Sequence, residues 1–464
     1  MEQFALPHTR QTLASTLSAP LPDVIARLIA AGEISEAIAS IDLFLSENLP
    51  LMLRNRLLLE RERLETLMRE YPFDAQGALE EMRRYYPDTS EEDFRKLELR
   101  GMIDFLFLNH EKRYFVRFAR SLARDNRYRR ELELSIDPAS PALDEMVGKI
   151  REKGALGYRI TLQSDISPAT EGFTPGHYRF WLPFPVPYAQ QSEIALLEGS
   201  PDLIAPEDAL TRTAYAARFL TAPETFSIRY SYLSVIRYAD PLHAQPPTAP
   251  LYPTEPPVCA ADLAEDHVQI RFTPFLRSLA QEIAGDAVTP LDKAWRVYRY
   301  VTEQISYAFV RDYRLLDHLA EYCARNRRGD CGLQALLFIT LCRILGVPAR
   351  WQSGLSFDDR DPGSHDWAQF YLEGWGWLFA DCSYGGSAFR AGNTIRHAFF
   401  FGNLDPLRMA STRQFMADFI PASRSVRRDP YDNQTGEMEC EEDSKADYRC
   451  IRHVNLTQFE EVEV

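Results

Sequence analysis

A cysteine stands at the start of a long apolar segment, within the sequence RGDCGLQALL at residues 328–337. Gly329 and Asp330 fit poorly inside a helix, whereas residues 332–345 favour one, so the sequence predicts a helix whose first turn holds Cys331. Asp330 is the expected N-cap of this helix. The positive end of a helix dipole lowers the pKa of a thiol and makes it a better nucleophile. Cys331 is therefore the candidate nucleophile, and the other six cysteines lack this setting.

A histidine and an aspartate follow in the order expected of a catalytic triad. His365 begins one predicted strand, and Asp381 ends the next. His365 would accept the thiol proton of Cys331, and Asp381 would orient the imidazole and stabilise its cation. Because side chains alternate along a strand, the two share a sheet face only if an odd number of residues connects the strands or a bulge intervenes. A pairing centred on Glu373 would set them opposite each other, whereas an even loop centred on residues 374–375 would separate them.

The remaining parts of such a site are less well defined in the sequence. The backbone N–H of Cys331 and the side chain of Tyr307 are candidate donors to a developing oxyanion. Zinc binding is the rival use of Cys331, His365 and Asp381, but the chain has no CxxC or HxxxH pair to complete a zinc site. We therefore expect neither a metal nor another cofactor.

The composition excludes several classes of protein. With 464 residues, 45% of them hydrophobic and 12% aromatic, the chain is long and apolar enough for two or three globular domains. A net charge of -15 disfavours nucleic acid or an anionic membrane as a partner. Seven scattered cysteines indicate thiols in a reducing compartment. No signal peptide is apparent at the N-terminus, so we expect a cytoplasmic protein. The oligomeric state stays open.

Composition and hydrophobic periodicity change along the chain and suggest five regions. We expect a mainly helical domain with a hairpin, an antiparallel β domain of the sandwich type, a proline-rich linker, a catalytic core and an acidic, solvated C-terminal segment, at residues 1–130, 131–240, 241–260, 261–425 and 426–464. Strands of the β domain are predicted at residues 131–136, 158–162, 177–182 and 226–233. In the core, Thr289 and Pro290 predict the N-cap and first residue of another helix.

Two features allow more than one interpretation. The predicted hairpin at residues 103–118 lies beside a helix and resembles a DNA-binding wing, but the acidic chain favours a simple packing module. Five of the six tryptophans lie between residues 295 and 377. They would suit either the wall of an aromatic groove or an ordinary hydrophobic core.

The segment around Cys331 resembles a known family. Residues 329–332, GDCG, and the helix exit GVPAR at residues 346–350 resemble the cysteine segment of the transglutaminase-like superfamily. His365, followed two residues later by Trp367, and the hairpin that ends at Asp381 resemble the histidine and aspartate segments of that family. The resemblance covers roughly residues 270–390. Residues 399–408 also resemble a segment that follows the core in bacterial relatives, where we expect it to dock near the cleft.

The resemblance implies an α+β protein with a papain-like core, in which the cysteine helix packs on an antiparallel sheet. It places Cys331, His365 and Asp381 at the positions of the catalytic triad. Family members attack a peptide or glutamine-type amide and pass the acyl group to an amine or to water, and bacterial members with extra N-terminal domains are usually hydrolases. We therefore expect a cysteine hydrolase acting on a peptide or protein. Acyl transfer to an amine and a catalytically silent binding or scaffold module are the alternatives.

Overall fold

The computed structural model of the protein describes residues 10–124, 127–134, 141–266, 269–357, 362–425, 427, 433–443 and 446–464. These residues form two compact units of helices and mainly antiparallel sheets, so the protein is of the α+β class. Unit 1 contains residues 11–138 and 305–330, and unit 2 contains residues 139–304 and 331–464. Residues 305–330 of the predicted core therefore belong to unit 1, and the chain returns to unit 2 at Cys331. The sequence analysis does not predict this interruption.

Unit 1 is mainly helical, as the sequence predicts. Its first helices are α1 (Arg10–Ser18), α2 (Asp23–Ala31), α3 (Ile34–Leu45), α4 (Leu51–Glu70), α5 (Ala75–Tyr85) and α6 (Glu91–Leu99), and they precede the predicted hairpin of β1 (Phe105–Leu108) and β2 (Glu111–Tyr114) and the helices α7 (Phe118–Arg124) and α8 (Arg127–Glu131). Ser90 begins α6 through a capping box with Asp93. One hydrophobic cluster joins the helices α2 to α8 and the hairpin, and it buries Leu57 and Leu64 of α4.

The second segment of unit 1 consists of short elements. They are β9 (Ser306–Tyr307), the 3-10 turn η2 (Tyr313–Leu315), α12 (Leu319–Asn326) and β10 (Arg328–Gly329). β9 and β10 pair in parallel, and Phe309 packs against the helical cluster of the same unit. These contacts explain why residues 305–330 group with the N-terminal helices.

The region after residue 130 departs from the sequence prediction in two places. Glu131 ends α8 and no strand forms over residues 132–134, so the predicted strand at 131–136 is wrong there; its last two residues lie outside the described part of the chain. The helix α9 (Pro141–Lys153) then precedes the first strand of unit 2. Tertiary context overrides weak strand propensity in such short alternating segments.

Two four-stranded antiparallel sheets form the predicted sandwich. Their strand orders are β17-β3-β8-β5 and β16-β4-β7-β6. The strands are β3 (Ala155–Pro168), β4 (Gly176–Pro183), β5 (Gln191–Glu198), β6 (Leu203–Ile204), β7 (Thr213–Leu220), β8 (Phe226–Arg237), β16 (Glu437–Cys440) and β17 (Cys450–Val462), with η3 (Ala446–Arg449) before the last. Phe180 of β4 faces Phe226 of β8, with 6.0 Å between ring centroids, so the sheets pack against each other.

The C-terminal region corrects a prediction. The predicted solvated segment at residues 426–464 instead contributes, in its described part, the strands β16 and β17, which are outer strands of the two sandwich sheets. Buried arginines neutralise the buried acids of β16. Arg179 Nη1 lies 2.5 Å from Glu439 Oε1, and Arg427 Nη2 lies 2.6 Å from Glu437 Oε1. The charge pattern alone gives no sign of these partners.

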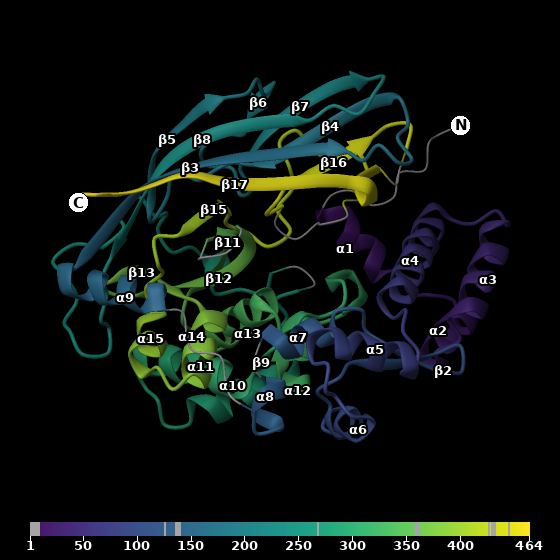
Figure 1. The fold of residues 1–464 in the computed structure, drawn as a ribbon, viewed down its shortest axis with the longest axis horizontal. Helices are drawn as coiled ribbons and strands as arrows, with labels where there is room; N and C mark the ends of the chain where they lie inside the picture. Colours follow the sequence, from purple (N-terminus) through teal and green to yellow (C-terminus); the bar gives the residue numbers. More distant parts are fainter. Residues whose placement is uncertain are drawn as a thin grey trace. The chain divides into compact units, whose positions relative to one another are not determined.

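The predicted core is built on a five-stranded antiparallel sheet of order β14-β13-β12-β11-β15. Figure 1 shows this sheet lying between helices α11, α13 and α14 and the sandwich sheets. Its strands are β11 (Ala349–Ser356), β12 (Gly363–Leu372), β13 (Gly376–Ala380), β14 (Phe401–Gly402) and β15 (Arg408–Thr412), and the helices of the core are η1 (Ala260–Asp262), α10 (Pro274–Ala284), α11 (Pro290–Gln304), α13 (Cys331–Ile344), α14 (Cys382–Arg390) and α15 (Thr394–Phe399). The arrangement is the expected cysteine-bearing helix on an antiparallel sheet.

The helix signals in this part of the sequence are confirmed. Thr289 Oγ1 accepts a hydrogen bond from the Asp292 backbone N–H at 3.1 Å, so Thr289 is the N-cap of α11. α13 is buried along residues 332–343, which explains why it is apolar on every side. Gly346, with φ +80°, follows its end, as the sequence predicts.

The proline-rich segment packs along the core sheet. The Trp377 indole N–H donates to the Pro256 carbonyl at 2.9 Å, and Gln369 Nε2 donates to Glu255 Oε1 at 2.8 Å. Tyr252 is buried. This segment is therefore a strap across the strands β12 and β13.

Most of the clustered tryptophans belong to the core rather than to a groove. Trp351, Trp367, Trp375 and Trp377 are all buried, and the half-buried Trp295 packs on other aromatic rings of the same unit.

In the described part of the chain, no single helix is long and apolar enough to cross a membrane. Two short helical segments, Gln11–Ser18 and Asp23–Ala31, meet the length and composition criteria only when taken together, and they are bent by 94°.

Candidate active site

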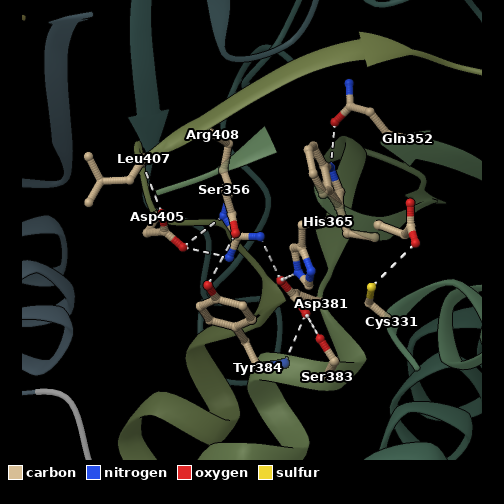
Figure 2. Close-up of polar contacts among 12 residues, drawn as sticks. Cys331, Gln352, Ser356, His365, Asp381, Ser383, Tyr384, Asp405, Leu407 and Arg408 are labelled. Carbon is tan, nitrogen blue, oxygen red and sulfur yellow. Dashed lines mark hydrogen bonds and ion pairs between the residues drawn. The ribbon is translucent and has the colours of Figure 1, made fainter. Parts of the chain in front are cut away.

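Cys331 is the first residue of α13, as the sequence predicts, and is half-buried. Its Sγ donates a hydrogen bond to Asp366 Oδ2 at 3.3 Å (Figure 2). Gln434 Nε2 donates to the other oxygen of Asp366 and, at 2.9 Å, to the His365 carbonyl. The sequence prediction missed both residues. Asp366 could have been noticed beside His365, but Gln434 comes from a segment that gives no local signal.

His365 and Asp381 form a buried pair. His365 Nε2 donates to Asp381 Oδ2 at 2.7 Å, and the two residues are only 4% and 0% exposed. Figure 2 shows the imidazole ring between Asp381 and Cys331. The structure thus brings the three predicted triad residues into one site.

The strand register explains how His365 and Asp381 meet. Leu372 pairs with Gly376, so three residues connect β12 and β13, and the odd connection required by the prediction is present. The pairing is centred on Gly374 rather than on Glu373. Continuing this register, Asp381 would lie opposite Trp367, one same-face position from His365, rather than directly opposite His365 as the prediction has it.

Asp381 lies just beyond the strand to which the sequence assigns it. β13 ends at Ala380, and Asp381 is the N-cap of α14, a helix that the sequence prediction missed. Its Oδ1 accepts hydrogen bonds from the Tyr384 backbone N–H at 3.0 Å and from Ser383 Oγ at 3.2 Å. Capping a helix holds the carboxylate in a fixed orientation, which leaves Oδ2 directed at His365.

Two further buried charges adjoin Asp381, and the sequence prediction did not name them as site residues. Arg408 Nη1 lies 3.0 Å from Asp381 Oδ2, and Arg408 Nη2 donates to Asp405 Oδ2 at 2.6 Å. Arg408 is fully buried and Asp405 is 2% exposed. The segment at residues 399–408 therefore supports the Asp381 carboxylate, and its docking near the cleft stays a prediction.

These contacts set the charge of Asp381. Burial raises the pKa of its carboxyl, but the charges of His365 and Arg408 and the hydrogen bonds from His365 and the Tyr384 backbone outweigh burial and lower that pKa to about 2. Burial lowers the pKa of the Arg408 guanidinium, whereas the carboxylates of Asp405 and Asp381 raise it, and the net shift is upward. At neutral pH, Asp381 is therefore negative and Arg408 positive.

Aromatic rings flank the histidine. The His365 ring lies 4.9 Å from the Tyr384 ring and 5.9 Å from the Trp367 ring, measured between centroids. The Trp367 indole N–H donates to Gln352 Oε1 at 2.6 Å, which fixes the tryptophan (Figure 2). Rings held in this way limit the orientations open to the imidazole.

Tyr307, the predicted side-chain oxyanion donor, is a residue of β9 in unit 1. Its ring contacts Phe309 and the Arg124 guanidinium of that unit. The roles of Tyr307 and of the Cys331 backbone N–H toward an oxyanion stay predictions.

The arrangement suits nucleophilic chemistry at a thiol. A cysteine at a helix N-terminus beside a histidine that is held by a buried carboxylate has the parts needed for acyl transfer through a thioester. Within the described ranges, no group of three or more His, Cys, Asp or Glu side chains could hold a metal ion.

Comparisons with known proteins give one family match and several distant structural similarities. Residues 277–382 match the model of the transglutaminase-like superfamily. A solved structure of a candidate cysteine protease from Cytophaga hutchinsonii is 15% identical, with 67% of this chain and 92% of that chain covered and a TM-score of 0.43. The periplasmic domain of TgpA from Pseudomonas aeruginosa is 13% identical, with 54% of this chain and 95% of that chain covered and a TM-score of 0.26. No curated protein matches the chain.

Proposed function

Because residues 277–382 are a transglutaminase-like domain, we propose that the protein is a cysteine hydrolase that cleaves an amide or peptide bond of a peptide or protein. One observation carries the proposal: Cys331 begins α13 beside the buried His365–Asp381 pair. The family supplies the class of enzyme, and this geometry supports Cys331, His365 and Asp381 as its catalytic residues. No metal or cofactor enters the reaction, and we propose the cytoplasm as its location.

The proposed reaction has two steps. His365 takes the proton of Cys331, and the thiolate attacks the substrate carbonyl to form a C–S bond. The C–N bond breaks as His365 returns the proton to the leaving amine. His365 then removes a proton from water, which attacks the thioester, releases a carboxylic acid and restores the thiol. Asp381, negative at neutral pH, stabilises the imidazolium in both steps.

The hydrogen bond from Cys331 to Asp366 adds a condition to this reaction. In the structure Cys331 Sγ lies 3.3 Å from Asp366 Oδ2. Transfer of the thiol proton to His365 requires the S–H bond to point toward the imidazole, and rotation about the Cβ–Sγ bond is sufficient for this.

Hydrolysis and acyl transfer use the same thioester and differ in the acceptor. We expect a mixed library of N-acetylated peptide amides to yield carboxylic acids, with little amide product even when a primary amine such as methylamine is added. Mass spectrometry of the products, with Cys331→Ala protein as the blank, separates the two outcomes. If the amine adduct dominated, the protein would be an acyltransferase instead.

A catalytically silent module is the second candidate, and the Cys331–Asp366 contact is the observation that favours it. A thiol that stays hydrogen-bonded to a carboxylate is a poor nucleophile, because the negative charge disfavours the thiolate. In that case no peptide in the library would be turned over.

A further inference from the structure

The charges at the site continue beyond the triad in a line of buried groups. His365 contacts Asp381, Asp381 contacts Arg408, and Arg408 contacts Asp405. Arg408 also donates from Nε to Asp405 Oδ2 at 3.0 Å, so Asp405 holds the guanidinium through two nitrogen atoms. Figure 2 shows these side chains in sequence across the sheet. Burial keeps the interactions strong, because little water screens them.

The order of the charges has an electrostatic consequence. Arg408 by itself would cancel the charge of Asp381 and leave little negative potential to stabilise an imidazolium. Asp405 cancels the charge of Arg408 in turn, so the three residues together carry one net negative charge next to His365. Arg408 can therefore fix the position of Asp381 without removing the charge that His365 needs.

The sandwich holds Arg408 in place. Tyr232 Oη of β8 donates to the Arg408 carbonyl at 2.8 Å, and the Val186 backbone N–H donates to the Ala410 carbonyl at 2.9 Å. Gln191 Nε2 of β5 donates to the same Ala410 carbonyl at 2.9 Å. All of these contacts lie within unit 2 and fix β15, the strand that begins with Arg408.

We propose that Arg408 is a positioning residue for the His365–Asp381 pair, and that Asp405 preserves the negative charge of Asp381 by neutralising Arg408. The proposal rests on the proposed function, since it assigns Arg408 and Asp405 to the same reaction. It also gives the sandwich a role in that reaction, because the sandwich fixes the strand that carries Arg408.

Other titratable groups of the described residues also lie near this line. Tyr384 of α14 and Tyr298 of α11 lie near Asp381, but burial raises the pKa of each phenol, so both are neutral below pH 8. Among the described residues, Asp366 of β12, Cys331 of α13 and Cys382 of α14 are further titratable neighbours. Asp366 and Cys382 are unchanged in every variant considered below, and Cys331 is replaced by alanine in all of them.

The proposal predicts opposite effects of two substitutions on the titration of His365. Asp405→Asn leaves Arg408 unbalanced, which disfavours the imidazolium and should lower the titration midpoint by about one pH unit. Arg408→Gln removes the positive charge and should raise the midpoint by a similar amount. The double variant restores the charge balance and should titrate close to the parent. A purely structural role would move both single variants in the same direction or in neither.

The measurement is an NMR titration of full-length protein with 13C-labelled histidine rings. Every variant carries Cys331→Ala, so that the thiol does not titrate with His365, and His365→Gln identifies its signal among the nine histidines. Glu439→Gln, which breaks another buried Arg–carboxylate pair in the sandwich, is the matched control and should leave the midpoint unchanged. If Arg408→Gln does not fold, the titration midpoints of Asp405→Asn and of the double variant test the proposal.

Two results would overturn the proposal: Asp405→Asn shifting the midpoint upward or by less than about 0.3 pH unit, or the double variant failing to restore it. The titration does not depend on turnover, so it separates this proposal from the proposed function, which is tested by turnover and product analysis of the native protein.

Discussion

Replacing Cys331 with alanine should abolish turnover while leaving the fold intact. Cys331 supplies the sulfur atom of the proposed thioester, so its replacement removes the nucleophile from the proposed reaction. Loss of the nucleophile from a triad typically lowers kcat by about ten-thousand-fold to a million-fold. The side chain is small and half-buried, and its removal should change the free energy of unfolding by about 1 kcal/mol or less.

Turnover of the peptide library and urea unfolding measure the two quantities separately. Cys259→Ala is the matched control, because Cys259 is an exposed cysteine outside the site. It should retain full activity. Activity of Cys331→Ala above about one tenth of the native level would show that another group performs the attack.

Placing a methyl group on Gly354 should strongly destabilise unit 2. Gly354 of β11 pairs with His365 on one side and with Ala410 of β15 on the other. An added Cβ would lie 1.9 Å from the Met409 carbonyl oxygen and 2.9 Å from its carbon, both of them backbone atoms. These atoms can yield only if β15 moves, so Gly354→Ala should cost about 3 kcal/mol or more.

This substitution should also reduce activity in whatever protein still folds, because β15 carries Arg408. Gly363→Ala is the matched control on the neighbouring strand β12, since an added Cβ there meets no atom within 4 Å. It should change the free energy of unfolding by about 0.5 kcal/mol or less. Equal unfolding midpoints in urea for the two variants would contradict the close approach of β11 and β15.

The sequence predicts the parts of the site that depend on local signals. Gly329 and Asp330 interrupt the helix before Cys331, and the apolar run after it can only be a buried helix, so the position of the cysteine follows directly. Thr289 and Pro290 define the start of α11 in the same way. The alternation of side chains in the hairpin likewise ties His365 and Asp381 to one face.

Other features depend on contacts between distant segments. In the sequence alone, nothing connects Arg408 with Asp381, and their contact exists only in the folded chain. Gln434 likewise contacts Asp366 although 68 residues separate them in the sequence. β16 is acidic, and its burial depends on partners such as Arg179 and Arg427. A single sequence does not reveal such partners, because each of these residues is common on protein surfaces.

The rate of alkylation of Cys331 by iodoacetamide, measured against pH in the native protein and in His365→Ala, tests the central claim most directly. The exposed Cys259 of the same chain serves as an ordinary thiol for comparison. If His365 activates Cys331, labelling of Cys331 should already be fast at about pH 5–6, and His365→Ala should move its midpoint toward the ordinary thiol value of about 8.5. If Cys331 in the native protein reacts no faster than Cys259 at mildly acidic pH, the thiol remains with Asp366 and the proposed catalytic pair does not exist.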